Sequence, residues 1–380
     1  MLRDIKSLGE DGLRALFRDW NQPEFRVSQL LEWLYPRRAA NWSEMSNLPK
    51  SLRERLAKEF TLQTLELVRK QGAHDATQKF LWKLADGSFV ESVLIPASPA
   101  LYGESSDRHT LCISTQVGCA YGCKFCASGL DGFKRNLGVH EIVEQVLAVE
   151  RWHLIETAKT SPPPQVPAAS LKSEHFKLKT RLVDNLVIMG MGEPLANYEN
   201  LLKALRILNA PWGGGIGARK ITISTSGLVP QILKLAEEPL QFRLAVSLHG
   251  ATDDVRNKIM PVNRKYPLAQ LVEACEFYRR RHERMISFEY ILIAGVNDGL
   301  DQTKPLAQLA KRLGAKVNLI PYNQVEGLKW ERPDDPTCEA FLSALEREKV
   351  VATLRREKGH DIDAACGQLR LKTQRELAGG

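Results

Sequence analysis

Three cysteines crowd into eight residues of this 380-residue chain, at Cys119, Cys123 and Cys126. Their spacing, C-x3-C-x2-C, directly follows a β-prone segment at 111–115, so we expect the thiols on one short loop. Three thiolates on one loop can hold three irons of a cubane cluster and leave the fourth iron open for chemistry. Structural zinc prefers four ligands, usually two C-x2-C pairs, and the sequence has no second pair. A zinc site completed by a distant residue and a chance clustering are the alternatives.

A glutamate stands at the end of another apolar strand, in the stretch Gly190-Met191-Gly192-Glu193-Pro194. Glycines at a strand end let a ligand approach the backbone, and Glu193 supplies a negative charge suited to an ammonium group. A plain turn is the alternative. Candidate ligand contacts also follow three more strands. They are Ser224 at the first, Ser247, Leu248 and His249 at the second, and Asn323 at the third. His249 alone could equally be a structural histidine.

Strands and helices alternate from about residue 109 onward. Nearly continuous apolar runs such as 186–189 and 244–248 indicate strands that are buried on both faces. We expect strands at 110–115, 185–189, 220–225, 242–248, 286–293 and 316–320, and helices at 140–152, 198–209, 228–237, 267–281 and 301–313. Six such units predict an α/β fold, a partial (β/α)6 TIM-like barrel, although periodicity alone leaves a doubly wound sheet open.

The pattern divides the chain into four regions. Apolar residues at helical spacing predict a helical accessory domain at 1–62, and Asp86-Gly87 between two β-prone runs predicts a hairpin within an extension at 63–108. The barrel follows at 109–335, and a C-terminal segment at 336–380 carries Cys366. A proline-rich, basic stretch at 158–181 is expected to be an insertion loop on the surface.

The cysteine loop, with Phe125 just before its third cysteine, resembles the radical S-adenosylmethionine (SAM) superfamily, and the stretch around Glu193 resembles that superfamily's Gly-Gly-Glu-Pro motif. A narrower resemblance, to the RlmN/Cfr group of RNA adenine methyltransferases, covers nearly the whole chain apart from 158–181. Its matching stretches are 90–93, 110–119, 190–195, 260–263 and 361–369.

This resemblance implies which residues hold the cofactors. It implies a partial barrel with one 4Fe-4S cluster on Cys119, Cys123 and Cys126 that has one open iron. It also implies two SAM molecules per turnover and SAM contacts from Gly192, Glu193, Ser224, Ser247, Leu248, His249 and Asn323.

The resemblance further implies three catalytic residues. Cys366 would accept a methyl group from the first SAM, and a 5′-deoxyadenosyl radical from the second would remove a hydrogen from it. The resulting methylene radical would add to adenine, and Cys112 would release the RNA by forming a disulfide with Cys366. Glu91 matches the proton acceptor. From the sequence alone, Glu91 could face solvent, and both cysteines could be core residues.

Details near the motifs favour methylation of adenine C2. Val117, Pro194 and the run 361–363 before Ala364 resemble the RlmN-like branch. We therefore expect C2 methylation of an adenosine in 23S rRNA and of the tRNA adenosine 3′ of the anticodon. Cfr-like C8 methylation is the alternative. A catalytically idle iron–sulfur RNA-binding protein is disfavoured, because a scaffold would not need Cys112, Cys366 and the cysteine loop together.

The composition and the net positive charge agree with a cytoplasmic enzyme that binds phosphate groups. The chain has 53 Lys+Arg against 45 Asp+Glu, a net charge of +8, and 43% hydrophobic residues, which excludes wholesale disorder. No run reaches the ~18 apolar residues of a membrane span. No secretory signal is apparent, and seven cysteines, an odd number, argue against a disulfide framework. A flavodoxin or ferredoxin is the expected electron donor, and monomer is the default state.

Several basic clusters are candidates for contact with RNA. They are Arg37-Arg38, 279–281 with Arg284, 355–356 with Lys358, and the basic stretch 158–181. Each could equally be a solvated helix face or loop. The N-terminal region resembles the accessory RNA-binding domain of the family, so its removal is expected to weaken RNA methylation while SAM cleavage survives.

Overall fold

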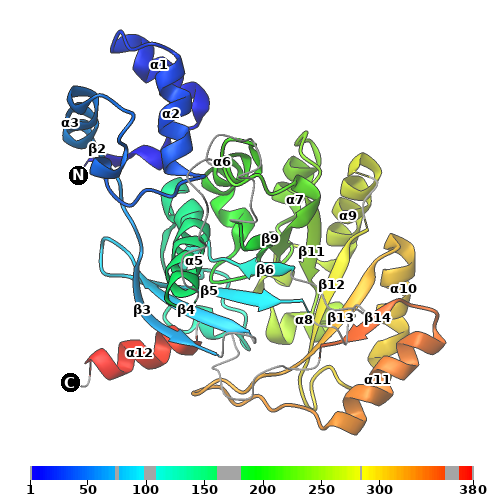
Figure 1. The fold of residues 1–380 in the computed structure, drawn as a ribbon. Coiled ribbons are helices and arrows are strands. Elements are labelled where there is room, and N and C mark those ends of the chain that lie inside the picture. The colour runs from blue at the N-terminus through cyan, green and yellow to red at the C-terminus, as the bar shows by residue number, and fades with distance from the viewer. Residues whose placement is uncertain are drawn as a thin grey trace.

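The computed structural model describes residues 2–72, 77–97, 108–160, 181–282, 285–355 and 368–378. Within them, a ten-stranded sheet runs through the molecule in the order β14-β13-β12-β11-β10-β9-β6-β5-β4-β3 (Figure 1). Each neighbouring pair from β6 to β14 is parallel, and the pairs from β6 to β3 are antiparallel. The parallel part thus continues into an antiparallel extension without a break.

The six predicted strands all form, and they lie side by side in chain order. They are β6 (His109–Cys112), β9 (Val183–Ile188), β10 (Ile221–Thr225), β11 (Arg243–Ser247), β12 (Ser287–Leu292) and β13 (Lys316–Pro321). A doubly wound sheet would reverse its strand order at a switch point, and this order never reverses. The prediction of a partial (β/α)6 barrel is therefore confirmed over a doubly wound sheet.

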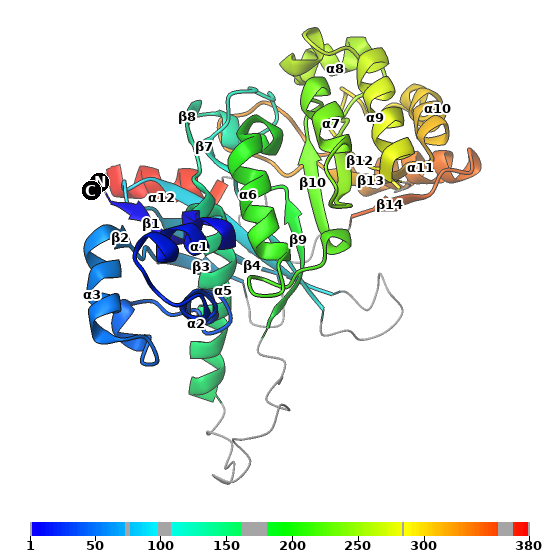
Figure 2. The same ribbon diagram turned by 90° about the horizontal axis from the view of Figure 1, so that it is seen from above.

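Helices connect these strands, and most of them lie along one side of the curved sheet (Figures 1 and 2). They are α5 (Val139–Thr160), α6 (Tyr198–Asn209), α7 (Val229–Ala236), α8 (Asp253–Ile259), α9 (Leu268–His282) and α10 (Thr303–Leu313). Short 3-10 helices include η5 (Pro194–Asn197), η6 (Ala218–Lys220), η7 (Pro261–Arg264) and η8 (Leu300–Gln302). The sequence pattern did not predict α8, because seven residues are too few to show a helical period.

Both ends of the sheet are extended by segments outside the six units. After α11 (Asp335–Arg347), β14 (Ala352–Leu354) adds a parallel strand beside β13. At the other end, the predicted hairpin of β4 (Gln78–Lys83) and β5 (Phe89–Pro96) pairs with β6, and β3 (Glu66–Gln71), which was not predicted, pairs with β4. The last helix, α12 (Gln368–Ala378), packs against β5.

The N-terminal residues form a helical lobe beside α5, as the periodicity predicts (Figures 1 and 2). Its elements are β1 (Arg3–Asp4), η1 (Ile5–Ser7), α1 (Glu10–Asp19), α2 (Phe25–Leu34), η2 (Trp42–Glu44), α3 (Lys50–Glu59) and β2 (Phe60–Thr61). One expectation is corrected here. Arg38 is not a solvent-facing basic residue, because its buried guanidinium lies 3.2 Å from the carboxylate of Glu150 on α5.

The expected insertion loop begins later than 158. Helix α5 continues to Thr160, where Lys159 pairs with Glu156 one turn earlier. Ser161-Pro162 follows, and a proline disfavours helical conformation in the residue before it. Arg181 is also part of the described structure, and its guanidinium donates to the carbonyl of Gly214. Residues 161–180 lie outside the described residues. None of the helices described is both long and apolar enough to cross a membrane.

Candidate active site

The three clustered cysteines lie on the loop between β7 (Gln116–Gly118) and β8 (Phe133–Asn136), which includes η3 (Ala127–Gly129). Gly118 has φ +75°, and a Cβ there would lie 1.9 Å from the carbonyl oxygen of Gly132, so only glycine fits. That same oxygen accepts the N–H of Cys119 at 3.2 Å. The loop therefore starts from a backbone geometry that places the first cysteine.

Two contacts hold the middle of the cysteine loop from opposite directions. The N–H of Lys124 donates to the carbonyl of Ile259, the last residue of α8, at 2.9 Å. The indole N–H of Trp330 donates to the carbonyl of Lys124 at 2.7 Å. Because both contacts fall between Cys123 and Cys126, they fix the part of the loop that carries the second and third thiols.

The thiols resist ionisation in the absence of a cation. Burial raises the pKa of Cys123 well above its usual value, and the neighbouring thiols Cys126 and Cys119 raise it further. Burial also raises the pKa of Cys119 to about 11, although N–H groups of Tyr121 and Glu193 oppose this effect. Cys119 and Cys123 become thiolates together only beside positive charge, which iron ions would provide. The donor set therefore fits an iron–sulfur cluster.

The arrangement of the side chains also bears on the zinc alternative. Over the described part of the chain, no group of three or more His, Cys, Asp or Glu side chains could hold a metal ion. A single zinc ion requires ligands that converge on one point. A cubane cluster takes each thiolate on a separate iron, so its cysteines need not converge on one point.

Glu193 stands at the end of β9 with its carboxylate buried. Its Oε2 accepts the N–H of Ser226 at 2.7 Å, and its Oε1 accepts the N–H of Leu195 at 3.1 Å. Burial raises the pKa of Glu193, and these hydrogen bonds lower it in part. Gly192 has φ +98°, and a Cβ there would lie 2.5 Å from the side chain of Gln116. The turn therefore requires glycine and presents a carboxylate that a cation would stabilise.

The polar strand ends lie together, as expected for parallel strands. Ser224 on β10 and Ser247 on β11 have their hydroxyl oxygens 3.3 Å apart. The ring of His249 stands edge-on to Phe125 of the cysteine loop, with ring centroids 4.9 Å apart. After β13, Tyr322 is close enough to Cys126 for the thiol to raise its pKa, so Asn323 next to it belongs to the same region. The site thus draws on four strand ends and the cysteine loop.

His249 is held in one state by its surroundings. It has φ +54°, and its Nδ1 accepts the N–H of Ile291 at 3.0 Å. Burial, together with the charge of Arg256, lowers the pKa of His249 to about 3. The ring is therefore neutral with its proton on Nε2, where it can donate one hydrogen bond. His249 is thus structurally satisfied at one nitrogen and able to bind a ligand through the other.

Comparison with known proteins identifies the family. The Radical SAM superfamily model matches residues 113–304, and the Ribosomal RNA large subunit methyltransferase N-terminal domain matches residues 3–62. A protein named "Probable dual-specificity RNA methyltransferase RlmN 3" from Opitutus terrae is 54% identical over 96% of this chain and 94% of its own length. The chain belongs to the RlmN family of radical SAM methyltransferases.

Other relatives agree over nearly the full length. A protein named "Probable dual-specificity RNA methyltransferase RlmN" from Akkermansia muciniphila is 49% identical over 99% of this chain and 97% of its own. The crystal structure of a radical SAM methyltransferase from Sphaerobacter thermophilus is similar with a TM-score of 0.84 and 39% identity. It covers 96% of this chain and 98% of that one. Membership of the radical SAM superfamily brings with it a 4Fe-4S cluster and SAM.

Two of the other expected catalytic residues of this RlmN-family chain, Glu91 and Cys112, lie on the neighbouring strands β5 and β6. Val93 on β5 pairs with Cys112 on β6, so Glu91, two residues from Val93, projects to the same face of the sheet as Cys112. Both Glu91 and Cys112 are buried. The alternative of a solvent-facing Glu91 is therefore wrong.

Glu91 also contacts the C-terminal helix. One carboxylate oxygen accepts the N–H of Arg370 in the first turn of α12 at 2.6 Å, and the other lies 3.4 Å from the ammonium group of Lys79. Cys366 itself lies outside the described residues, and α12 begins two residues after it in the chain. Glu91 thus fixes the helix that follows the expected methyl-accepting cysteine.

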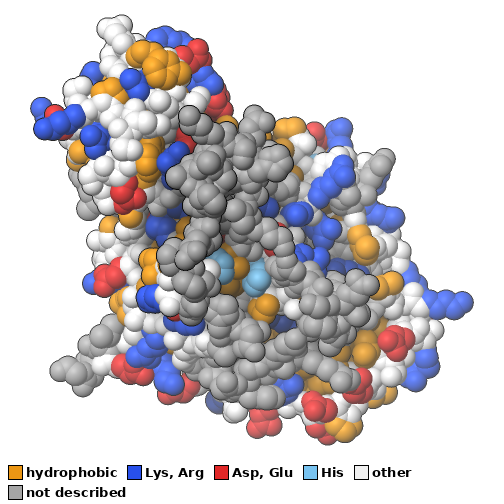
Figure 3. All heavy atoms as spheres, viewed as in Figure 1, with side chains coloured by type: hydrophobic (Ala, Val, Ile, Leu, Met, Phe, Trp, Pro, Cys, Tyr) orange, Lys and Arg blue, Asp and Glu red, His pale blue; other side chains and the backbone are white. Residues whose placement is uncertain are grey.

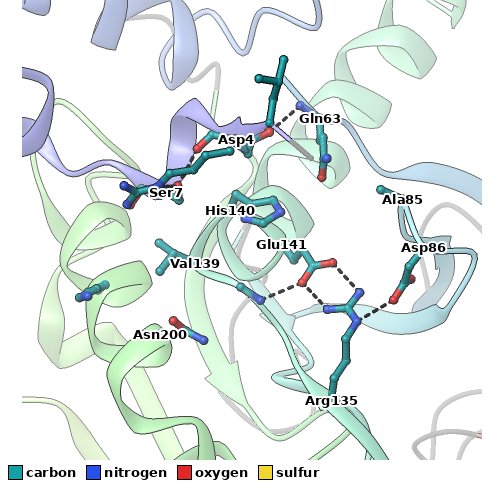
Figure 4. Close-up of a pocket in the computed structure, with 14 residues that line it drawn as sticks. Asp4, Ser7, Gln63, Ala85, Asp86, Arg135, Val139, His140, Glu141 and Asn200 are labelled. Carbon is teal, nitrogen blue, oxygen red and sulfur yellow. Dashed lines mark hydrogen bonds and ion pairs between the residues drawn. The ribbon is translucent and has the colours of Figure 1, made fainter. Parts of the chain in front are cut away.

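A separate pocket of about 510 Å³ lies where the N-terminal lobe meets the barrel (Figure 4). His140 and Glu141 at the start of α5 line it, and Asp4 faces them from the lobe. Arg135 spans one side, because its guanidinium donates to both Glu141 and Asp86. None of the expected site residues lines this pocket.

Sequence reasoning did not find the residues that support the site. Gln116 accepts the N–H of Glu193 at 2.8 Å, and Asn297 donates to the carbonyl of His249 at 2.7 Å. Arg256 is fully buried beside the strand ends. Two of them had a sequence signal, because Gln116 lies within the matching stretch 110–119 and Arg256 precedes the stretch 260–263 by a few residues.

Proposed function

We propose that this chain methylates C2 of an adenosine in 23S rRNA and of the tRNA adenosine 3′ of the anticodon. The observation that carries the proposal is the full-length similarity to relatives named dual-specificity RNA methyltransferase RlmN. The cluster would be held by Cys119, Cys123 and Cys126. SAM would contact Gly192 and Glu193, then Ser224, then Ser247, Leu248 and His249, and finally Asn323.

The chemistry needs a route to an adenine carbon that is not nucleophilic. When bound, the cluster and SAM supply a radical able to remove hydrogen from a methyl group. The Cys366 thiolate takes up that methyl group beforehand, which is covalent catalysis by a sulfur nucleophile. After the carbon has bonded to adenine, the adduct would lose the C2 hydrogen as a proton and its unpaired electron to the oxidised cluster. The thiolate of Cys112 would then attack the sulfur of Cys366, and the bond from Cys366 to carbon would break, with its electron pair staying on the carbon, which takes up a proton to become the methyl group. Placement of Glu91 and Cys112 on one face of the sheet supports these roles.

Glu91 has an environment suited to a proton acceptor. The Lys79 ammonium group lies 3.4 Å from its carboxylate, and the helix that follows Cys366 begins beside it. A buried carboxylate placed near the reacting base would take a proton from it. Reduction of the Cys112–Cys366 disulfide then needs two electrons, which the thiol pool of a cytoplasm provides. A flavodoxin or ferredoxin would deliver the single electron to the cluster.

We further propose that the N-terminal lobe and the end of α9 contact RNA phosphates. Lys and Arg side chains lie on the lobe and over α7 and α9 in the view of Figure 3. Arg279, Arg280 and Arg281 occupy the last turn of α9 and are exposed. Arg37 is exposed as well, whereas Arg38 is buried and forms an ion pair with Glu150. Deletion of 1–60 would also remove Arg38, the ion-pair partner of Glu150 on α5, so point variants test the RNA role better than truncation.

An anaerobic assay with SAM that carries a fully deuterated methyl group tests the proposal. The protein is reconstituted with its cluster and incubated with a ribosomal RNA fragment, and the nucleosides are then weighed against 2- and 8-methyladenosine standards. The proposed route predicts 2-methyladenosine that keeps two of the three deuterium atoms. A C8 product would establish the Cfr-like alternative instead. Formation of 5′-deoxyadenosine without a methylated base would show that the substrate is wrong.

A further inference from the structure

Arg256, on the short helix α8, is a fully buried cation whose hydrogen bonds join two strand ends. Its Nε donates to the carbonyl of Leu248 at 2.8 Å, and its Nη2 donates to the carbonyl of Ser226 at 2.6 Å and, more weakly, to that of Ser247 at 3.4 Å. Its Nη1 donates to the side-chain oxygen of Asn263 at 2.9 Å. Within the described residues, these partners are all uncharged oxygens.

The backbone around Arg256 leaves room for this arginine in particular. A Cβ on Gly250 would lie 2.9 Å from the main-chain nitrogen of Arg256. Gly227 has φ +113°, and a Cβ there would lie 3.3 Å from Nη2. Asn263 is itself fixed, because its amide donates to Asp253 at 2.8 Å. The matching stretch 260–263 thus contributes one side of a cradle for the guanidinium.

Helix α8 also touches the cysteine loop. Its last residue, Ile259, accepts the N–H of Lys124, which is adjacent to Cys123. Ser226, whose carbonyl binds Arg256, donates its own N–H to Glu193. Arg256 is therefore linked by one residue to the carboxylate of the site and by one helical turn to the loop of the cluster.

We propose that Arg256 is a positioning residue for SAM whose guanidinium holds the ends of β10 and β11 in the geometry that binds SAM, and whose charge stabilises the reduced cluster. A planar fork with several donors can bind three carbonyls from two strands at once, whereas an ammonium group is a point charge. The proposal rests on the cysteines and strand ends proposed above as cluster and SAM sites. It does not depend on which RNA is methylated.

The charge should act on the cluster because Arg256 lies on the helix whose last residue, Ile259, contacts the cysteine loop. Burial lowers the pKa of Arg256 to about 10, so the guanidinium remains protonated at neutral pH. A positive charge in a site of low dielectric constant favours the state with one electron more, in which the cluster gains an electron from its donor. Loss of the charge should therefore shift the reduction potential to more negative values.

Three variants of the reconstituted protein separate geometry from charge, and all measurements omit RNA. Arg256→Met removes both, Arg256→Lys keeps the charge, and Arg312→Met, which removes an exposed arginine on α10, is the control. The dissociation constant of SAM is measured by anaerobic equilibrium dialysis, and the potential by a redox titration followed by electron paramagnetic resonance. Iron content and thermal unfolding are recorded for each variant.

We expect SAM to bind at least about tenfold more weakly to both Arg256 variants, since each loses hydrogen bonds from a charged donor. The potential should become more negative in Arg256→Met and stay at the wild-type value in Arg256→Lys and Arg312→Met. If Arg256→Met does not fold, Arg256→Lys decides alone. Wild-type SAM affinity in Arg256→Lys would overturn the positioning role, and a shifted potential in that variant would overturn the role of charge. A wild-type protein that binds SAM and methylates no RNA would refute only the proposed function.

Discussion

The buried pair of Arg38 and Glu150 should stabilise the docking of the N-terminal lobe on α5. Arg38 is 8% exposed and Glu150 is 3% exposed, with 3.2 Å between the paired atoms. Arg37, the preceding residue, pairs with Glu32 at the surface, where the two side chains are 51% and 46% exposed. Two adjacent arginines thus differ mainly in burial, so Arg37→Met is a matched control for Arg38→Met.

The size of the expected loss in unfolding free energy depends on the hydrogen bonds that Glu150 would retain in Arg38→Met. Removing one partner of a buried ion pair costs about 3–5 kcal/mol, because the other charge is left uncompensated. The carboxylate of Glu150 also accepts the N–H groups of Leu182 and Val183 at 3.0 and 2.9 Å, and these bonds would persist. We therefore expect Arg38→Met to lower the free energy of unfolding by about 2–3 kcal/mol. Arg37→Met breaks only a surface ion pair, so we expect it to lower the free energy of unfolding by about 0–1 kcal/mol.

Two assays check this prediction. Urea unfolding followed by circular dichroism gives the free energies for the apoprotein. RNA affinity as a function of salt concentration then separates structure from binding, because each lost phosphate contact lowers the salt slope by about one. The slope for Arg38→Met should equal that of the wild type. An unfolding free energy within about 0.5 kcal/mol of Arg37→Met, or a reduced salt slope in Arg38→Met, would refute the reasoning.

Three further predictions concern the site and the pocket. Gly192→Ala should weaken SAM binding at least about tenfold in equilibrium dialysis, because its positive φ and close neighbour exclude a Cβ, whereas Gly217→Ala, where a Cβ meets nothing within 4 Å, should bind normally. Trp330→Phe should lose the indole hydrogen bond to the cysteine loop and release iron faster to a chelator than the wild type; equal rates would contradict that role. The hydrogen bond from Arg135 lowers the pKa of Asp86 to about 2. The Asp86–Arg135 pair therefore stabilises the folded protein above pH ~4, and this contribution is lost as the pH falls towards ~2. Because the site is exposed, the contribution is below about 1 kcal/mol. Asp86→Asn should therefore destabilise the apoprotein in urea at pH 6 and not at pH 2, and an equal effect at both would exclude this ion pair.

The strands of the barrel could be predicted from the sequence because strands that are buried on both faces consist almost entirely of apolar residues. Runs such as 244–248 are apolar on both faces, which only a covered parallel strand requires. Strand β3 (Glu66–Gln71) has no such apolar run, because most of its residues are exposed, including Leu67 and Val68. The place of the hairpin in the sheet depends on its pairing with β6, which local periodicity does not contain.

The same limit applies to the site. The cysteine loop and Glu193 were found because their types and spacing carry chemistry in themselves. The common face of Glu91 and Cys112 depends on the register of two strands, which the sequence does not specify. Arg256 and Arg38 would normally be placed at the surface, since arginine is seldom fully buried. Their burial depends on carbonyls and carboxylates contributed by distant segments.

The main chain of one residue, Ser226, contacts both of the opposite charges that the site keeps in its interior. Ser226 donates its N–H to the carboxylate of Glu193 at 2.7 Å and accepts from the guanidinium of Arg256 through its carbonyl at 2.6 Å. Burial works against both charges, because it raises the pKa of Glu193 and lowers that of Arg256. The dipoles of the main chain compensate each charge without neutralising it. An ammonium group placed beside Glu193 would recover electrostatic energy that burial has cost, which is the physical reason for our proposal that Glu193 binds the methionine end of SAM.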